Sequence, residues 1–259
     1  FSREGIVIEV QSTAYFVPDW PSPASVACAI TLRFGGVSKE PFLSNNFATH
    51  VGDDYASVIS NRERLQKRLS LPEEPRWLNQ VHGNRVIGSS EILQDNCADG
   101  SFSGASGEVC VVLTADCVPV LLCNRNGDRV AAIHAGWRGL ASNIIKSAVA
   151  VFHDPVEEIM AYLGPAIGPT AFEVGSDVLE VFIARAESEC GKERIRDAFL
   201  PYKDRYLANL YSLTRLKLKA SGIEAIYGGD FCTWTDKNRF FSYRRDRTTG
   251  RNASLIWLR

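Results

Sequence analysis

Histidine is scarce in this sequence, and features that mark several classes of protein are missing. The chain has 259 residues but only four histidines and one methionine. Its long apolar runs, such as 109–113 and 118–123, have the length of strands, so none of them spans a bilayer. The first residues contain charged side chains and no apolar stretch of signal length, so we expect no secretory signal.

Net charge is also nearly absent. Twenty-nine basic residues oppose thirty acidic residues, which leaves a formal charge of -1. A protein without an excess of positive charge has no global field that gathers nucleic acid or anionic lipid. We therefore expect neither nucleic acid nor a membrane among the partners, and no pattern identifies a protein partner. We expect the arginines near the C-terminus to lie on a solvated, salt-bridged surface: Arg239, Arg244, Arg245, Arg247 and Arg251.

The cysteine pattern does not predict a disulfide framework. Seven cysteines, an odd number, are scattered through a long chain, unlike the dense even sets of small secreted domains. Reduced thiols in a cytoplasmic protein are the expectation. Apolar residues make up 45% of the chain, which is ordinary for a globular protein, and no linker or repeat divides it. We therefore expect a single domain over residues 1–259.

Hydrophobic periodicity predicts a mixture of helices and strands. Helical spacing occurs at 55–69, 139–152, 176–186 and 205–220. Runs rich in Val and Ile predict strands at 5–10, 27–34, 85–88, 108–113, 118–124, 129–134, 158–163, 240–244 and 253–258. The order lacks a steady strand–helix alternation, and no dinucleotide, P-loop or nucleophile-elbow motif is present. The fold class that we predict is α/β (α+β), a sandwich with a mixed β-sheet flanked by helices.

Three chemically capable residues lie at the ends of predicted strands. His82 precedes Gly83 at the entry to one strand, Cys117 separates two apolar strands, and His134 ends a third. Two neutral imidazoles and a thiolate form a zinc-type ligand set, and three protein ligands leave a fourth position for water or substrate. The separations of 35 and 17 residues require a preformed fold. The alternative is that these residues are a buried thiol and satisfied core histidines.

Further polar residues are candidates for catalysis and for anion binding. Asp116 directly precedes Cys117 and is a candidate for orienting a ligand or acting as a general base, or else for a turn that bonds its own backbone. Arg138, where a helix opens, and Arg33, before a Gly-Gly turn, are candidate anion contacts. The alternative is that these two arginines only begin a helix and end a strand.

Taken together, the motifs are similar to those of a known family. Those that carry the resemblance run in order over nearly the whole chain: "TLRFGGVS", "NNFATHVGDD", "WLNQVHG", "TADCVPVLL", "AAIHAGWRG", "LGPAIGP" and "FFSYRRDRTTGRNAS". The chain resembles the laccase-domain family of bacterial multicopper polyphenol oxidase-like proteins. This resemblance implies an α/β fold and a His-Cys-His metal site formed by His82, Cys117 and His134. Asn46 and Gln80 lie within the matched motifs and are candidate substrate contacts.

The activities that the resemblance implies are phenol oxidation, purine nucleoside phosphorolysis, adenosine deamination and editing of peptidoglycan precursors. A multicopper oxidase needs about ten histidines, mostly in His-x-His pairs, because imidazole is the ligand that suits its coppers. This chain has four histidines and no such pair. One Zn²⁺ with a water serves the other activities, and Cu²⁺ is possible at the same site.

The leading hypothesis is therefore a zinc-dependent enzyme acting on purine nucleosides and phosphate. It cleaves adenosine, inosine, guanosine and S-methyl-5'-thioadenosine by phosphorolysis and deaminates adenosine, with Arg33 and Arg138 as candidates to hold phosphate. The alternative is a hydrolase that cleaves an amide of muropeptide precursors. A copper-dependent polyphenol oxidase and a non-enzymatic zinc-binding module are the remaining readings.

Overall fold

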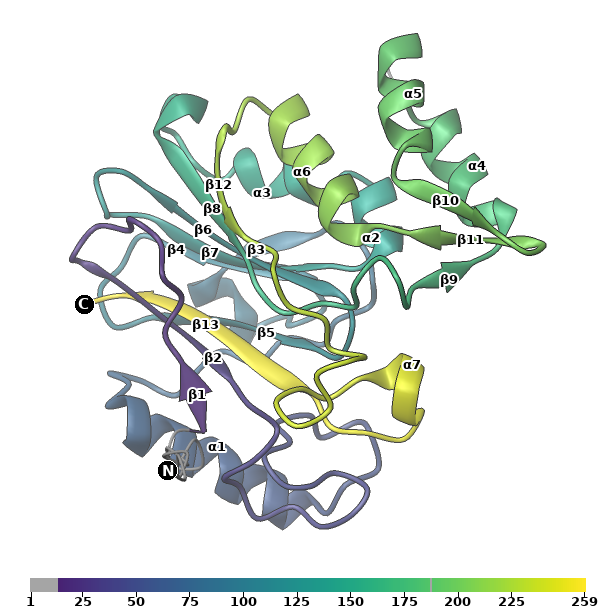
Figure 1. Ribbon diagram of the computed structural model, residues 1–259. Helices are drawn as coiled ribbons and strands as arrows, with labels where there is room; N and C mark the ends of the chain where they lie inside the picture. Colours follow the sequence, from purple (N-terminus) through teal and green to yellow (C-terminus); the bar gives the residue numbers. More distant parts are fainter. Residues whose placement is uncertain (1–13, 187) are drawn as a thin grey trace, which may run out of the picture.

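Two β-sheets pack face to face between helices, which gives four layers (Figure 1). The structure is a computed structural model and describes residues 14–186 and 188–259. The predicted strand at 5–10 lies outside the described residues. In Figure 1 the layers follow one another from the helix α1 at the bottom, through the two sheets, to the helices α2, α3 and α6 at the top. The prediction of an α/β sandwich with a mixed sheet is confirmed.

The smaller sheet of the sandwich has four strands in the order β1-β2-β13-β5, all antiparallel. Its strands are β1 (Tyr15–Phe16), β2 (Val26–Thr31), β5 (Val109–Thr114) and β13 (Asn252–Leu258). The C-terminal strand β13 thus lies in the middle of a sheet whose other strands come from the first half of the chain. Helix α1 (Tyr55–Leu69) begins at Asp54, whose carboxylate accepts a hydrogen bond from the Ser57 N–H, and it covers the outer face of this sheet.

The larger sheet has six strands in the order β12-β8-β6-β7-β4-β3. Its strands are β3 (Val86–Gly88), β4 (Gly100–Ser103), β6 (Val118–Asn124), β7 (Val130–Ala135), β8 (Ile159–Leu163) and β12 (Ala225–Gly228). The two edge strands pair in parallel and the inner strands pair antiparallel, so the sheet is mixed. The pair β6 and β7 is a hairpin, and its open end brings position 117 near position 134.

The remaining helices lie mostly on or beside the outer face of the larger sheet, whereas α7 (Tyr243–Asp246) lies beyond the end of the four-stranded sheet (Figure 1). They are α2 (Trp137–Ala141), α3 (Ile144–Val149), α4 (Ser176–Ala184), α5 (Glu189–Arg196), α6 (Leu210–Ala220) and the short α7, with two 3-10 turns, η1 (Ser89–Leu93) and η2 (Val156–Glu158). A third sheet of order β10-β11-β9 projects to one side together with α4 and α5. Its strands are β9 (Glu173–Val174), β10 (Phe199–Tyr202) and β11 (Arg205–Ala208).

Alternation along the strands explains how the layers are filled. On β6, Val120 and Leu122 face the helices, whereas Leu121 and Cys123 face the other sheet, because successive side chains point to opposite faces of a strand. All residues of β6 are buried. Because both faces of β6 are buried, its sequence is an unbroken apolar run. A strand with one exposed face would instead alternate apolar and polar residues.

One predicted strand was wrong, one predicted helix began too early, and another was divided. The predicted helix 205–220 begins only at Leu210, because Asn209 caps it and the preceding residues pair as the strand β11. The predicted strand 240–244 is a turn followed by α7, where the Ser242 hydroxyl accepts from the N–H of Arg245. The predicted helix 139–152 is two helices, because Asn143 at φ 65° breaks it. Left-handed backbone of this kind cannot continue an α-helix.

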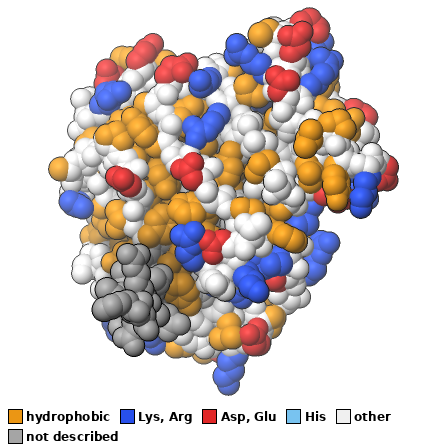
Figure 2. Space-filling view, in the orientation of Figure 1, with side chains coloured by type: hydrophobic (Ala, Val, Ile, Leu, Met, Phe, Trp, Pro, Cys, Tyr) orange, Lys and Arg blue, Asp and Glu red, His pale blue; other side chains and the backbone are white. Residues whose placement is uncertain are grey.

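The surface has no dominant sign of charge on the face seen in Figure 2, where basic and acidic side chains are interspersed. Within the described part of the chain, no helix combines the length and the apolar character needed to cross a membrane.

Replacing Tyr211 with phenylalanine tests how much the hydrogen bonds of its hydroxyl stabilise the fold. The buried Tyr211 hydroxyl accepts from the Ala166 N–H at 2.7 Å and contacts the carbonyl oxygens of Gly164 and Phe231. Loss of the hydroxyl leaves a buried N–H unsatisfied, so we expect unfolding to become easier by about 1–3 kcal/mol in urea titrations. Tyr55→Phe, at a tyrosine that is 67% exposed, is the control and should change stability by less than about 0.5 kcal/mol. Equal free energies of unfolding for the wild type and Tyr211→Phe would contradict a stabilising role of the Tyr211 hydroxyl.

Candidate metal centre

His82, Cys117 and His134 meet at one end of the larger sheet. Their ligand atoms all lie within 4.8 Å of one another. Cys117 immediately precedes β6 and His134 lies in β7, so the antiparallel pairing of these strands brings them together. His82 reaches the same point from the loop before β3, and its ring centroid lies 4.7 Å from that of His134. His134 is buried, Cys117 is half-buried and His82 is exposed, so the cluster is open on one side.

Unusual backbone conformations occur at this cluster. His82 has φ 61° and Asp116, next to Cys117, has φ 96°. Positive φ is uncommon for residues with a side chain, although Asp, Asn and His tolerate it better than most. Such strain persists only where the surroundings hold it, and it is concentrated at functional sites.

Asp99, which sequence reasoning missed, holds both histidines. The Asp99 carboxylate is fully buried and contacts Nδ1 of His134 at 2.8 Å. It also accepts hydrogen bonds from the backbone N–H groups of His82 at 2.8 Å and Gly83 at 2.6 Å. Because Nδ1 of His134 is occupied by a carboxylate, Nε2 is the nitrogen left for a metal. The only sequence signal was an aspartate directly before β4, which is a common position for a turn residue.

The charges within the cluster favour a thiolate. Burial raises the pKa of Cys117, but the neighbouring His134 and His82 outweigh it and lower that pKa to about 6. Burial lowers the pKa of His134, but the Cys117 thiolate and Asp99 outweigh it and raise that pKa to about 9. His134 likewise holds the pKa of Asp99 below its ordinary value despite burial. A thiolate is the form of cysteine that binds metals.

The residues present fit a metal ion. The set of two imidazoles and one thiolate is a known donor set for Zn²⁺ and also accepts copper. Gly136 keeps the space free, because a Cβ at this position would lie 3.0 Å from Cys117 Sγ and 3.2 Å from His82 Cδ2. The carboxylate on His134 supplies the outer support that ligand histidines usually have.

Asp116 lies beside the cluster and joins three segments of the chain. Its carboxylate accepts from the Thr233 hydroxyl and from the Arg244 backbone N–H, each at 2.6 Å. Its backbone carbonyl accepts from the Ile167 N–H at 2.9 Å. Asp116 therefore bonds residues that are distant in the sequence. These bonds fix its carboxylate in the residue next to Cys117.

Asn46 and Gln80 are engaged with the protein itself. The Gln80 side-chain amide makes two hydrogen bonds of 2.8 Å with the Leu113 backbone, which attaches the loop of His82 to β5. Asn46 is fully buried, and its side-chain oxygen accepts from the Arg251 N–H at 2.9 Å. In this structure both residues position their neighbours.

Arg33 and Arg138 are placed differently from each other. The Arg33 guanidinium donates to the carbonyl oxygens of Leu43 and Lys237. Arg138, on α2, is exposed and stacks on the Trp137 ring at 4.4 Å.

Arg251 is a second residue that the sequence analysis did not assign to the site. Burial lowers its pKa, and the charges that oppose this effect are those of Cys117 and Asp116. Its Nη1 donates to the carbonyl oxygens of Thr249 and Gly250, which fixes the side chain. The expectation of a salt-bridged arginine surface was therefore wrong for Arg251 and for Arg244, which bonds the Glu173 carbonyl. It holds for Arg239 and Arg245, which pair with Asp236 and Asp246.

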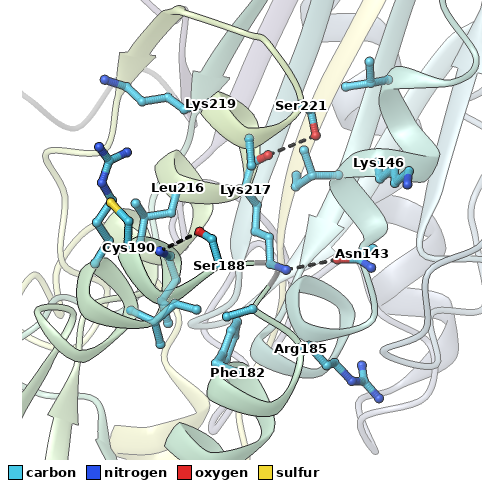
Figure 3. Close-up of a pocket in the computed structure, with 18 of the residues that line it drawn as sticks. Asn143, Lys146, Phe182, Arg185, Ser188, Cys190, Leu216, Lys217, Lys219 and Ser221 are labelled. Carbon is cyan, nitrogen blue, oxygen red and sulfur yellow. Dashed lines mark hydrogen bonds between the residues drawn. The ribbon is translucent and has the colours of Figure 1, made fainter.

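One cavity is separate from the cluster. It has a volume of about 790 Å³, lies between α3, α4, α5 and α6, and contains no residue of the metal centre in its lining (Figure 3). In Figure 3, Lys217 points across it and bonds the Asn143 side chain, and Ser188 bonds a backbone N–H. The second cavity, of about 590 Å³, lies on the side of the metal centre where Arg244 contacts Asp116.

Comparison with known proteins agrees with this geometry. The family described as multi-copper polyphenol oxidoreductase laccase matches residues 27–259. The chain belongs to this family. The resemblance seen in its sequence motifs is thus confirmed for nearly the whole length of the laccase-like domain.

Two relatives of this family are named as nucleoside enzymes. Purine nucleoside phosphorylase YfiH of Escherichia coli (strain K12) is 49% identical over 243 residues, which are 93% of this chain and 98% of that protein. Purine nucleoside phosphorylase PA4543 of Pseudomonas aeruginosa is 48% identical over 249 residues, which are 95% and 98% of the two chains.

Solved structures share the laccase-like fold. The Neisseria meningitidis protein NMB0706, of family DUF152, superposes with a TM-score of 0.89 at 46% identity and covers 95% of this chain and 99% of that one. YlmD of Geobacillus stearothermophilus superposes with a TM-score of 0.86 at 30% identity, covering 96% and 97%.

Removing any one ligand should remove the metal. We expect alanine at His82, Cys117 or His134 to lower bound zinc strongly, because each provides one of three protein ligands. Metal analysis of the purified variants, with circular dichroism to show that they remain folded, is the measurement. Cys190→Ala, at an exposed cysteine outside the cluster, is the control. Full zinc content in all three ligand variants would disprove the assignment.

Asp99→Asn tests the support of the two histidines. An amide has only one accepting oxygen, so it cannot serve the imidazole and the His82 N–H at Oδ1 and the Gly83 N–H at Oδ2 together, and we expect metal affinity to fall by about 10–100-fold. Competition with a chelator measures the affinity. Asp95→Asn changes an exposed carboxylate on the same loop and should leave the affinity unaltered. A folded Asp99→Asn protein with wild-type affinity would show that the carboxylate serves only the fold.

Proposed function

We propose that the protein is a zinc-dependent purine nucleoside phosphorylase acting on adenosine, inosine, guanosine and S-methyl-5'-thioadenosine. The observation that carries the proposal is a single cluster of three metal ligands, open on one side. The names of relatives 49% and 48% identical over nearly the whole chain support the same activity. Hydrolytic deamination of adenosine to inosine is proposed as a second activity of this centre.

The ligand set argues against multicopper oxidation, although the family carries that name. Of the four histidines, only His82 and His134 lie in the cluster. A three-copper cluster with a fourth copper needs about ten histidines, so this chain has ligands for one ion. Zn²⁺ is our proposal for that ion, with Cu²⁺ as the alternative at the same three residues.

His82, Cys117 and His134 would hold the ion, and Asp99 would keep the histidines in place. When bound, Zn²⁺ supplies a Lewis acid that polarises a substrate group. In phosphorolysis an oxygen of hydrogen phosphate forms a bond to C1′ of the ribose while the bond from C1′ to the purine breaks. The electron pair leaves with the purine, which gains the proton of the phosphate, and ribose 1-phosphate is the other product.

Asp116 is the proposed catalytic carboxylate. The hydrogen bonds from Thr233 and Arg244 fix it one residue from Cys117, which is a suitable place to orient a reacting group or accept a proton. Arg33 and Arg138 remain the sequence-based candidates for holding phosphate, and Asn46 and Gln80 those for the nucleoside. The seven cysteines are all free in the structure, which supports the proposal of a reducing, cytoplasmic location.

Product analysis tests this function. With zinc-loaded protein and adenosine, we expect adenine and ribose 1-phosphate only when phosphate is present, and inosine with ammonia in either case. Cys117→Ala should lower both rates by about 100-fold or more, since a Lewis acid contributes several kcal/mol of transition-state stabilisation. Cys190→Ala is the matched control.

Other products would support other functions. Release of an amino acid from a nucleotide-linked muropeptide, without nucleoside cleavage, would favour the hydrolase. Rapid oxygen consumption with about four coppers per chain would favour the oxidase and contradict our single-ion interpretation. Bound zinc without turnover of any of these compounds would indicate a non-enzymatic zinc-binding module.

A further inference from the structure

The smaller cavity is linked to the metal centre through Arg244, whose backbone N–H donates to Asp116, although neither Asp116 nor a candidate ligand lines it. It is lined by the segment after Gly168, by side chains of β10 and β11, and by Trp234, Arg244 and Arg247. Three segments that bond Asp116 continue into its walls. Arg244 itself donates its N–H to Asp116, Trp234 follows Thr233, and the segment after Gly168 follows Ile167. The cavity is therefore held in place by the residue that precedes the metal-binding cysteine.

The described lining of this cavity carries an excess of positive charge. It contains Arg205, Arg244 and Arg247, opposed by the single carboxylate of Glu173. That carboxylate lies 3.3 Å from Nε of Arg205, and Arg244 donates from Nη1 to the Glu173 carbonyl oxygen. The other guanidinium nitrogens of these two arginines have no acceptor among the described residues. Arg247, which is exposed, has no side-chain hydrogen bond to the described part of the chain.

Unused guanidinium donors in one cavity are suited to a tetrahedral anion. An arginine fork binds phosphate through two parallel hydrogen bonds, and these charge-assisted bonds are stronger than neutral ones. The contacts of Arg244 with the Glu173 carbonyl and with the Phe172 ring at 5.1 Å hold its guanidinium before any ligand arrives. Arg33, by contrast, already donates to two backbone carbonyls.

The cavity is larger than a phosphate ion requires and has an aromatic side. Its volume is about 590 Å³, and Trp234 and Tyr202 in its lining are 43% and 40% exposed. Exposed aromatic faces next to arginines provide a surface for the less polar part of a ligand. The combination suits a phosphoryl group attached to a sugar.

We propose that this cavity is the phosphoryl site of the enzyme, which takes inorganic phosphate before the reaction and the phosphate of ribose 1-phosphate after it. The catalytic role rests on the proposed function, whereas the binding of a phosphoryl group does not. In this proposal Arg205, Arg244 and Arg247 bind the anion in place of the sequence-based candidates Arg33 and Arg138, and Trp234 contacts the sugar.

Phosphate binding by zinc-loaded variants tests the proposal. We expect Arg247→Gln and Arg205→Gln each to weaken the binding of inorganic phosphate in calorimetry by about 10-fold, through loss of a charged donor pair. The KM for phosphate should rise by a similar factor, and by more than the KM for the nucleoside. Arg64→Gln, at an exposed arginine on α1, is the matched control and should change neither quantity.

Ribose 1-phosphate distinguishes the sugar-linked ligand from the free ion. We expect it to bind more tightly than inorganic phosphate to the wild type, and we expect Trp234→Leu to remove this difference, whereas Tyr55→Leu, at an exposed tyrosine on α1, keeps it. Equal binding of the two ligands by the wild type would overturn the sugar contact.

Different results would contradict the phosphoryl site and the proposed phosphorylase activity. Unchanged phosphate affinity in both arginine variants, with zinc content and folding intact, overturns the phosphoryl site even if the wild type cleaves nucleosides. Phosphate binding that depends on Arg247 and Arg205, in a wild type that cleaves no nucleoside, upholds the phosphoryl site and refutes the phosphorylase. A wild type that binds no phosphate overturns the site.

Discussion

The carboxylate of Asp99 is the contact on which the metal centre depends. It is fully buried and holds the ring of His134 and the backbone of His82 at the same time. A buried carboxylate is stable only when it is hydrogen-bonded to charged or polar partners. This requirement fixes the loop of His82 against the end of β7, and it directs one nitrogen of His134 toward Cys117. The ligands therefore keep their arrangement through the fold of the protein, before any ion binds.

The two-sheet architecture places this contact at the end of the β6–β7 hairpin. Strands that are buried on both faces leave room for polar side chains only where they end. Cys117 and His134 lie at such ends, and α2 begins immediately beyond them without a side chain at Gly136. The two packed sheets thus form a rigid support, and the strand ends and loops at their edge carry the side chains of the candidate metal centre.

Asp116 connects the candidate metal centre with the smaller cavity through Arg244. Its backbone at φ 96° and its bonds to Thr233 and Arg244 connect the cysteine turn with the C-terminal third of the chain. Arg251 is held on the same side, where Asn46 fixes its backbone. The negative charges of the Cys117 thiolate and of Asp99 thus lie beside His134, whose pKa of about 9 favours the positive form, and near the Arg251 guanidinium. This distribution suits a site where a cation and an anionic ligand lie close together.

The sequence alone was enough to predict the residues of the candidate metal site and most segments of the core. Cys117 and His134 stood out because they end apolar strands, and that pattern is local and periodic. Helix α1 was predicted with its observed bounds for the same reason. The motifs along the whole chain indicated the family, but the local pattern of the C-terminal motif led to the wrong prediction of a strand at 240–244, where the cap of Ser242 starts α7.

The side chains that surround the candidate ligands could be identified from the folded structure but not from the sequence. Asp99 contacts His134 across 35 positions of the sequence, and Asp116 contacts Arg244 across 128. Such partners depend on strand register and on loop conformation, which no local period encodes. The same holds for Arg244 and Arg251, which were indistinguishable in sequence from the salt-bridged Arg239 and Arg245. Hydrophobic spacing determines which face of a strand is buried, whereas the meeting of distant strand ends determines what surrounds the metal ligands.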